Sequence, residues 1–130
     1  MPEPIWVLDE SVPAIHNRQI AEHGGLSGVR DPSALASALG RPKNKFAYGE
    51  PTIFALGAAY AFGLAANHPF ADGNKRTAYV VSVLFLALNG YRVEACQDEK
   101  YRTFLNLAAG KLSETELAAW FKTHCAPIKP

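Results

Sequence analysis

The chain has 130 residues, of which 48% are hydrophobic and 19% charged, which is typical of one globular domain. Thirteen basic and twelve acidic residues leave a net charge of +1, so no broad electrostatic field favours a nucleic acid or an anionic membrane as partner. Two cysteines are too few for a disulfide framework, and the first residues, MPEPIWVLDE, lack the basic start and apolar run of a secretory signal. We therefore expect one soluble domain that works in the cytoplasm.

Apolar residues recur with helical spacing along most of the chain, which predicts a mostly α-helical protein. The first helix runs from Ser11 to about His23 and is stopped by two glycines. Asp31 is typical of an N-cap and Pro32 of a first helical position, so a second helix begins there and ends at Gly40.

The next segment, RPKNKFAYGE from Arg41 to Glu50, combines proline, glycine and clustered lysines and has no clear period. We predict a surface loop or an irregular hairpin there. A solvated connector is the simplest interpretation of such a segment, because loops run over protein surfaces.

Two runs, 51–67 and 77–91, contain no charged side chain. Both are shorter than the roughly 20 apolar residues of a membrane span, and charges lie between them, so two buried central helices are favoured over a membrane hairpin. Small residues in the first run, whose glycines cost helix propensity, indicate that another helix approaches closely; they are Gly57, Ala58, Ala61, Gly63 and Ala65.

Asn89 and Gly90 close the helix of the second run. Three further elements follow it. The stretch YRVEA predicts a brief strand or extended arm, and a helix follows from about Gln97 to Ala109. The last helix begins with a capping box, SETE, and its apolar side carries Leu117, Trp120, Phe121 and His124.

The stretch HPFADGNKRTA, residues 68–78, connects the two central helices. Pro69 disfavours helical geometry at His68, so one helix ends there and the next begins at residue 72 or 73. A helix N-terminus offers unpaired N–H groups and a positive dipole. Lys75 and Arg76 in its first turn are unfavourable unless an anion is bound.

Two interpretations of this stretch are open. In the structural one, the two cations point into water, Asp72 is an N-cap and His68 only closes the preceding helix. In the functional one, Asp72 holds Mg²⁺ and His68 is a general base, because histidine titrates near neutrality. An anion cradle completes the set that phosphoryl or nucleotidyl transfer requires, and consists of Gly73, Asn74, Lys75 and Arg76.

The same residues resemble a known signature. HPFADGNKRTA is similar to the Fic/Doc superfamily motif H-x-F-x-[DEN]-[AG]-N-[GK]-R, and its lysine places it with the Doc (death-on-curing) toxins. The stretch GGLSGVRDPSALASALGRP and the apolar pattern of the central runs also resemble Doc proteins, so the resemblance covers most of the chain. It implies an all-α, single compact bundle of about six helices over residues 1–130, with a short flap hairpin or extended arm.

The resemblance also implies an activity. Doc toxins resemble protein kinases that transfer a phosphoryl group from ATP to a threonine of elongation factor Tu and so stop translation. A Phd-type antitoxin neutralises them. No nucleic acid or membrane is expected as a direct partner.

Site residues follow from the resemblance position by position. His68 matches the catalytic base, Asp72 the Mg²⁺-binding acid and Phe70 the aromatic anchor of the loop, while Arg76 is both catalytic and phosphate-binding. Gly73, Asn74 and Lys75 match the other phosphate-binding positions. The segment at about 41–50 corresponds to a flap that docks the target as an added strand, through Lys43, Asn44, Lys45, Phe46, Ala47 and Tyr48.

Departures from the family's adenylylating branch favour phosphoryl transfer. That branch resembles H-P-F-x-x-G-N-G-R-x-x-R, whereas here Lys75 replaces a glycine and Tyr79 the second arginine. The lysine would crowd the backbone nest and favour another nucleotide orientation. Pro69 and Gly73 are nearer to the adenylylating motif, so protein adenylylation remains an alternative, as does a catalytically silent binding module. No internal inhibitory [ST]-x-x-x-E-[GN] motif occurs, which favours restraint by a separate antitoxin.

Other candidate sites are weaker. His16, His23 and His124 lack partners at metal-ligand spacing and are expected at the core edge or surface. Arg30 could brace a loop through an ion pair with Asp31, but a helix cap is the favoured role of Asp31.

Overall fold

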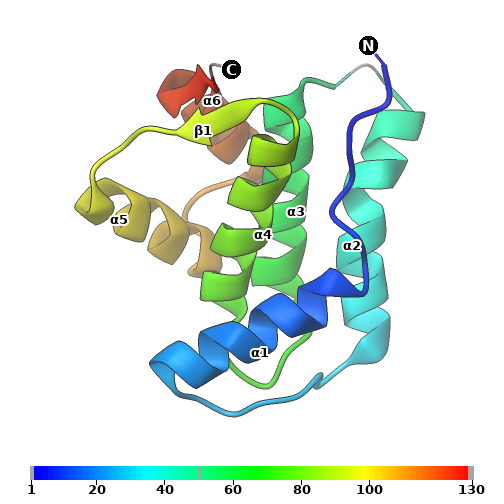
Figure 1. Ribbon diagram of the computed structural model, residues 1–130, viewed down its shortest axis with the longest axis vertical. Coiled ribbons are helices and arrows are strands. Elements are labelled where there is room, and N and C mark those ends of the chain that lie inside the picture. The colour runs from blue at the N-terminus through cyan, green and yellow to red at the C-terminus, as the bar shows by residue number, and fades with distance from the viewer. Residues whose placement is uncertain (1, 50, 129–130) are drawn as a thin grey trace.

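Helices α3 (Ile53–Asn67) and α4 (Asn74–Leu88) run antiparallel through the middle of the molecule (Figure 1). The computed structural model describes residues 2–49 and 51–128, which form six helices and two short strands and confirm the all-α class. The other elements are α1 (Ser11–His23), α2 (Pro32–Ala47), β1 (Tyr91–Val93), α5 (Gln97–Ala108), α6 (Glu114–His124) and β2 (Cys125–Pro127).

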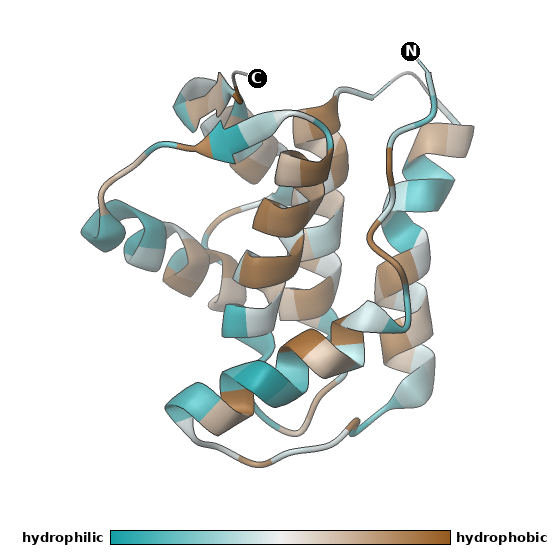
Figure 2. Cartoon of the chain, in the orientation of Figure 1, coloured by the Kyte–Doolittle hydropathy of each residue, from teal (hydrophilic) through white to brown (hydrophobic). Residues whose placement is uncertain are grey.

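The central helices are buried because they are apolar on most sides. Figure 2 shows α4 hydrophobic over most of its length and hydrophilic at its first turn. Glycines let the neighbours approach closely, as predicted. A Cβ added at Gly57 would lie 3.1 Å from Leu86 of α4, and one at Gly63 would lie 3.1 Å from the Cα of Ala38 in α2. In the described residues, none of the helices has the length and apolar character needed to cross a bilayer.

The predicted end of the second helix at Gly40 is wrong, and so is the predicted loop after it. Helix α2 continues to Ala47 with Pro42 inside it, and Tyr48 is its C-cap. Glu50 lies outside the described residues. Proline normally ends a helix, because it lacks an N–H donor and clashes with the preceding turn.

Long-range contacts explain this extension of α2. Arg41 and Lys45 both form salt bridges with Glu114 at the start of α6. The ring of Phe46 lies 5.9 Å from that of Trp6, edge to face. These contacts connect the second half of α2 to distant parts of the chain and favour helix over a free loop.

The elements after α4 agree with their predictions. Strand β1 forms where a brief strand was expected, and its antiparallel partner β2 lies at the far end of the chain. Helix α6 begins with the predicted capping box, in which Ser113 and Glu116 exchange hydrogen bonds with each other's backbone. The N-terminus of α6 is thereby satisfied locally.

Substitutions at two of the helical glycines, Gly63 and Gly40, should have opposite effects on stability. We expect Gly63→Val to lower the free energy of unfolding by about 1–3 kcal/mol, because the new side chain meets the backbone of α2. Gly40→Ala is the matched control: nothing lies within 4 Å of the added Cβ, so we expect a gain of about 0.5–1 kcal/mol. Urea denaturation measures both; equal effects of the two substitutions would contradict the packing described.

Candidate functional site

The loop between α3 and α4 lies at the end of the molecule opposite both described termini (Figure 1). His68 caps α3 in the left-handed conformation (φ 48°, ψ 55°), which is rare for a residue with a side chain. Gly73 caps the start of α4, also at positive φ (74°), where glycine carries no penalty. The loop thus turns sharply at both ends.

The side chain of Asn74 closes this loop. Its Oδ1 accepts a hydrogen bond from the Phe70 N–H (3.0 Å), and its Nδ2 donates one to the Phe70 carbonyl (3.0 Å). The ring of Phe70 is buried below. Because both polar atoms of the amide are engaged by the Phe70 backbone, the Asn74 side chain holds the loop, while its backbone N–H has no helical acceptor and is available to a phosphate.

His16 of α1 supports the loop from below and was not singled out from the sequence as a site residue. The side chain is buried, and its ring stacks on that of Phe70 at 3.9 Å with 6° between the planes. Its Nε2 lies 2.7 Å from the carbonyl oxygen of Asp72, so the proton is on Nε2 and is donated to that carbonyl. This contact fixes the peptide between Asp72 and Gly73, whose N–H and C=O point in opposite directions.

A second support comes from the segment between α1 and α2. The Arg30 guanidinium donates to the backbone carbonyls of His68 and Asn67, which have lost their helical partners. Arg30 therefore braces the end of α3 through these backbone carbonyls, and not through the ion pair with Asp31 that the sequence suggested. The Asp31 carboxylate accepts from the Ala34 N–H (3.1 Å) and caps α2, as predicted.

The same segment pairs with the loop as a short antiparallel bridge. Val29 lies opposite Phe70, with hydrogen bonds from Arg30 N–H to Pro69 O (2.8 Å) and from Ala71 N–H to Gly28 O (3.1 Å). In this arrangement the N–H and C=O of Val29 itself point away from the loop. One backbone edge beside the loop is therefore left open.

The first turn of α4 offers backbone donors to a ligand. The Thr77 N–H is the first with a helical acceptor, Gly73 O at 3.0 Å, so the amides of residues 74–76 have none. The structural interpretation of Asp72 as an N-cap is wrong: its Oδ1 accepts from the adjacent Gly73 N–H (2.9 Å), its Oδ2 accepts from the Leu26 N–H (3.4 Å), and no side chain caps α4. A cavity of about 400 Å³ opens here, lined by His68, Asp72, Gly73, Asn74, Lys75 and Arg76 together with three alanines.

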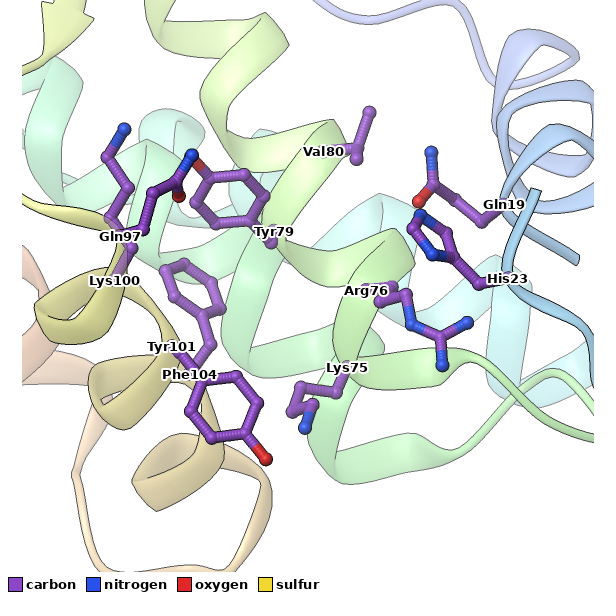
Figure 3. Close-up of a pocket in the computed structure, with 10 residues that line it drawn as sticks. All are labelled: Gln19, His23, Lys75, Arg76, Tyr79, Val80, Gln97, Lys100, Tyr101 and Phe104. Atoms are coloured by element: carbon purple, nitrogen blue, oxygen red, sulfur yellow. The ribbon is translucent and has the colours of Figure 1, made fainter.

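The two cations extend this region toward α5. The Lys75 ammonium lies 4.7 Å from the centre of the Tyr101 ring, and Arg76 is exposed. Both residues also line a second cavity of about 540 Å³ between α1, α4 and α5 (Figure 3). Lys75 therefore extends beyond the loop rather than filling it.

The predicted flap residues are not brought to this site. Lys43 to Ala47 belong to α2, and they lie toward the end of α3 opposite the loop (Figure 1). Helical backbone uses its own N–H and C=O groups, so these residues cannot take an added strand. The segment beside the loop is instead 24–31.

His124 and Cys125, at the end of α6, have surroundings that indicate structural roles. His124 bridges α6 to Glu99 of α5, with 2.7 Å between Nε2 and the carboxylate. Burial raises the pKa of the Cys125 thiol to about 11, so this thiol is protonated at neutral pH. Within residues 2–49 and 51–128, no three metal-binding side chains cluster.

Comparison with known proteins identifies the family of this chain. Residues 6–86 match the family model described as the Fic/DOC family, which is more than half of the chain. The chain belongs to the Fic/Doc family. Within this family, it is 40% identical over 88 residues to Protein kinase doc of Escherichia phage P1, covering 67% of this chain and 70% of that protein. It is also 40% identical over 75 residues to Toxin Doc of Mycolicibacterium smegmatis, covering 55% and 57%.

The support by His16 predicts a local effect on the loop. We expect His16→Phe, which keeps an aromatic ring over Phe70 but removes the donor to Asp72, to weaken the loop by about 1 kcal/mol. Hydrogen exchange of the Phe70 and Ala71 amides should then speed up about fivefold. His23→Phe, on the same helix but exposed, is the control and should leave these amides unchanged. Equal exchange in both variants would show that the hydrogen bond does not hold the loop.

Proposed function

We propose that residues 1–130 form a single domain with the activity of a Doc toxin. It is a protein kinase that transfers a phosphoryl group from ATP to a hydroxyl of a translation factor, with elongation factor Tu as the expected acceptor. A Phd-type antitoxin restrains it, and both act in the cytoplasm. The observation that carries the proposal is one cavity lined by His68, the Asp72 carboxylate and the first turn of α4.

His68 is the general base. Its imidazole is exposed and lines the loop cavity, while its backbone is fixed by Arg30. In the reaction, the acceptor O–H bond breaks as its proton passes to this imidazole, and the oxygen attacks the γ-phosphorus. The bond from that phosphorus to the bridging oxygen breaks, and ADP leaves with the electron pair.

The phosphates lie on the N-terminus of α4. The amides of residues 74–76 and the helix dipole suit an anion, and Lys75 and Arg76 add positive charge to the same cavity. Asp72 would hold Mg²⁺, since a single carboxylate together with substrate phosphates is a common set of ligands for this ion. The bound ion would neutralise phosphate charge during the transfer.

Phosphoryl transfer is favoured over adenylylation at this site. Adenylylating members of the family carry a second arginine where this chain has Tyr79, which packs edge to face on Phe104 at 5.1 Å. No cation is therefore available at that position for a second phosphate. The identity to a relative named Protein kinase doc supports the same choice.

The acceptor docks along the segment 24–31 rather than at 41–50. The outward N–H and C=O of Val29 can pair with an extended chain beside the loop. Leu26 is 69% and Val29 40% exposed, and they offer apolar contacts next to this edge. An extended acceptor there would run close to His68.

The kinase proposal predicts toxicity and a specific label transfer. We expect expression of the chain alone to arrest growth and His68→Ala to relieve the arrest, because the proton acceptor is lost. With purified protein and an extract of translation factors, label should move to protein from ATP labelled at the γ position and not at the α position. Kinetics of label incorporation and growth curves measure the two effects.

Two outcomes would count against this reading. Label arriving only from the α position would make the chain an adenylyltransferase. Arrest by His68→Ala as strong as that by the unaltered chain would leave a binding module without catalysis. Arg18→Ala, an exposed substitution on α1 outside both cavities, serves as the control and should stay toxic.

The docking edge predicts a separate effect on the acceptor. We expect Val29→Pro, which removes the outward N–H, to lower phosphorylation of the acceptor at least about tenfold while leaving ATP affinity within about twofold. Val29→Thr keeps the N–H and the branched side chain and should behave like the unaltered chain. Full activity of the proline variant would place the acceptor elsewhere.

A further inference from the structure

The Asp72 carboxylate, which we expect to bind Mg²⁺, lies against the connection between α1 and α2. This connection, segment 24–31, runs along the loop between α3 and α4 (Figure 1). The backbone pairing of the two segments ends with the hydrogen bond from Ala71 N–H to Gly28 O. Beyond that point the contact continues through the Asp72 side chain, because its Oδ2 accepts from the Leu26 N–H at 3.4 Å.

Gly25 leaves open the space that this carboxylate occupies. A Cβ added at Gly25 would lie 2.7 Å from Asp72 Oδ2 and 3.2 Å from its Cγ. Both distances are shorter than van der Waals contact, so a side chain at position 25 would displace the carboxylate, which is the flexible partner. Gly25 also has a φ of 117°, which residues with a side chain rarely adopt.

Ile20 of α1 packs at the same place. Its Cδ1 would lie 3.2 Å from a Cβ added at Gly25 and 3.2 Å from one added at Gly73. The side chain of Ile20 is thus in contact with both glycines, one on each side of the Asp72 carboxylate in the chain. Helix α1, segment 24–31 and the loop therefore meet beside Asp72.

The contacts of Asp72 still leave room for a metal ion. A carboxylate has about four lone-pair sites, and here Oδ1 accepts from Gly73 N–H and Oδ2 from Leu26 N–H. Each oxygen keeps a lone pair, and Asp72 lines the loop cavity together with the first turn of α4. Groups that orient a metal-binding side chain typically account for roughly 10–100-fold in metal affinity.

We propose that Gly25 and the Leu26 N–H position the Asp72 carboxylate for Mg²⁺. Both are positioning residues, because they act through Asp72, and both lie outside the signature motif. The proposal rests on the proposed function, since it takes Asp72 as the magnesium ligand. Segment 24–31 then holds the metal ligand on its inner edge and docks the acceptor on its outer edge.

The test measures how much magnesium strengthens ATP binding in the absence of any acceptor. Calorimetric titration gives the ATP affinity with magnesium and with EDTA. We expect magnesium to tighten ATP binding to the unaltered chain, and Gly25→Ala to reduce this tightening about tenfold. The affinity of Gly25→Ala in EDTA should stay within about twofold, because the amides of α4 and its two cations are unchanged.

Gly28→Ala is the matched control. Gly28 has a similar φ of 105°, but nothing lies within 4 Å of an added Cβ, so the substitution adds strain without meeting Asp72. We expect the magnesium effect of Gly28→Ala to stay within about twofold of the unaltered chain.

A double-mutant cycle isolates the contact between Gly25 and Asp72 from backbone strain. Urea denaturation is measured for Gly25→Ala with and without Asp72→Ala. The fall in urea midpoint caused by Gly25→Ala should be smaller once the carboxylate is removed, because the strain is the same in both backgrounds. Gly28→Ala should lower the midpoint equally in both.

The possible outcomes separate this proposal from the proposed function. Full magnesium tightening in Gly25→Ala would overturn the positioning role and leave the kinase proposal standing. An equal loss of ATP affinity with magnesium and with EDTA, or a midpoint change independent of Asp72, would also overturn it, since Gly25 would then serve only the fold of the loop. Failure of the unaltered chain to bind ATP would overturn the proposed function itself.

Discussion

Two hydrogen bonds between the Asn74 side chain and the Phe70 backbone hold together the short connection on which the site depends. The chain leaves one buried helix at His68 and enters another at Asn74, so the loop has few residues with which to satisfy its own polar groups. The Asn74 amide supplies the missing partners from inside the loop. The first amides of α4 therefore stay free, which is the condition for anion binding there.

The same helix start carries a cost to folding that an anion removes. Cations at a helix N-terminus are unfavourable by about 0.3–1 kcal/mol each when exposed. Lys75 and Arg76 both occupy the first turn of α4, and no side chain caps this end. A stable helix without a ligand would favour acids or a cap there, as α6 has at Ser113 and Glu116. The contrast between these two helix starts within one chain is an argument for function at α4.

Local signals explain which parts of the fold could be predicted from the sequence. The glycines after α1, the charge-free runs of α3 and α4 and the capping box of α6 each act within a few residues, and each gave the right element. Helix α2 was misjudged because Pro42 and Gly40 argue for an end, whereas Arg41 and Lys45 reach Glu114, far along the chain. Such long-range pairing overrides the helix-ending propensity of glycine and proline, and it leaves no signal in the local sequence.

The residues of the site also divide into those with a local sequence signal and those whose role depends on long-range packing. The loop residues could be found from their motif, but His16 could not, and Arg30 could be considered only as a partner of Asp31. Their roles come from the packing of α1 and of segment 24–31 on the loop. The stacking of His16 on Phe70 and the hydrogen bond from Arg30 to the His68 carbonyl join residues that are distant in sequence, so only the folded chain brings them together.

The position of α5 shows how the core controls one wall of the second cavity. Phe104 lies between Tyr79 of α4, at 5.1 Å, and Phe121 of α6, at 6.3 Å, so one ring connects the cavity wall to the core. Tyr101 lies three residues earlier, about one helical turn away, and its direction follows from that anchor. A change that moves Phe104 would therefore shift this cavity wall without touching the loop. The loop and the second cavity are thus fixed by different contacts: Asn74 and His16 hold the loop, and Phe104 holds the wall that α5 contributes.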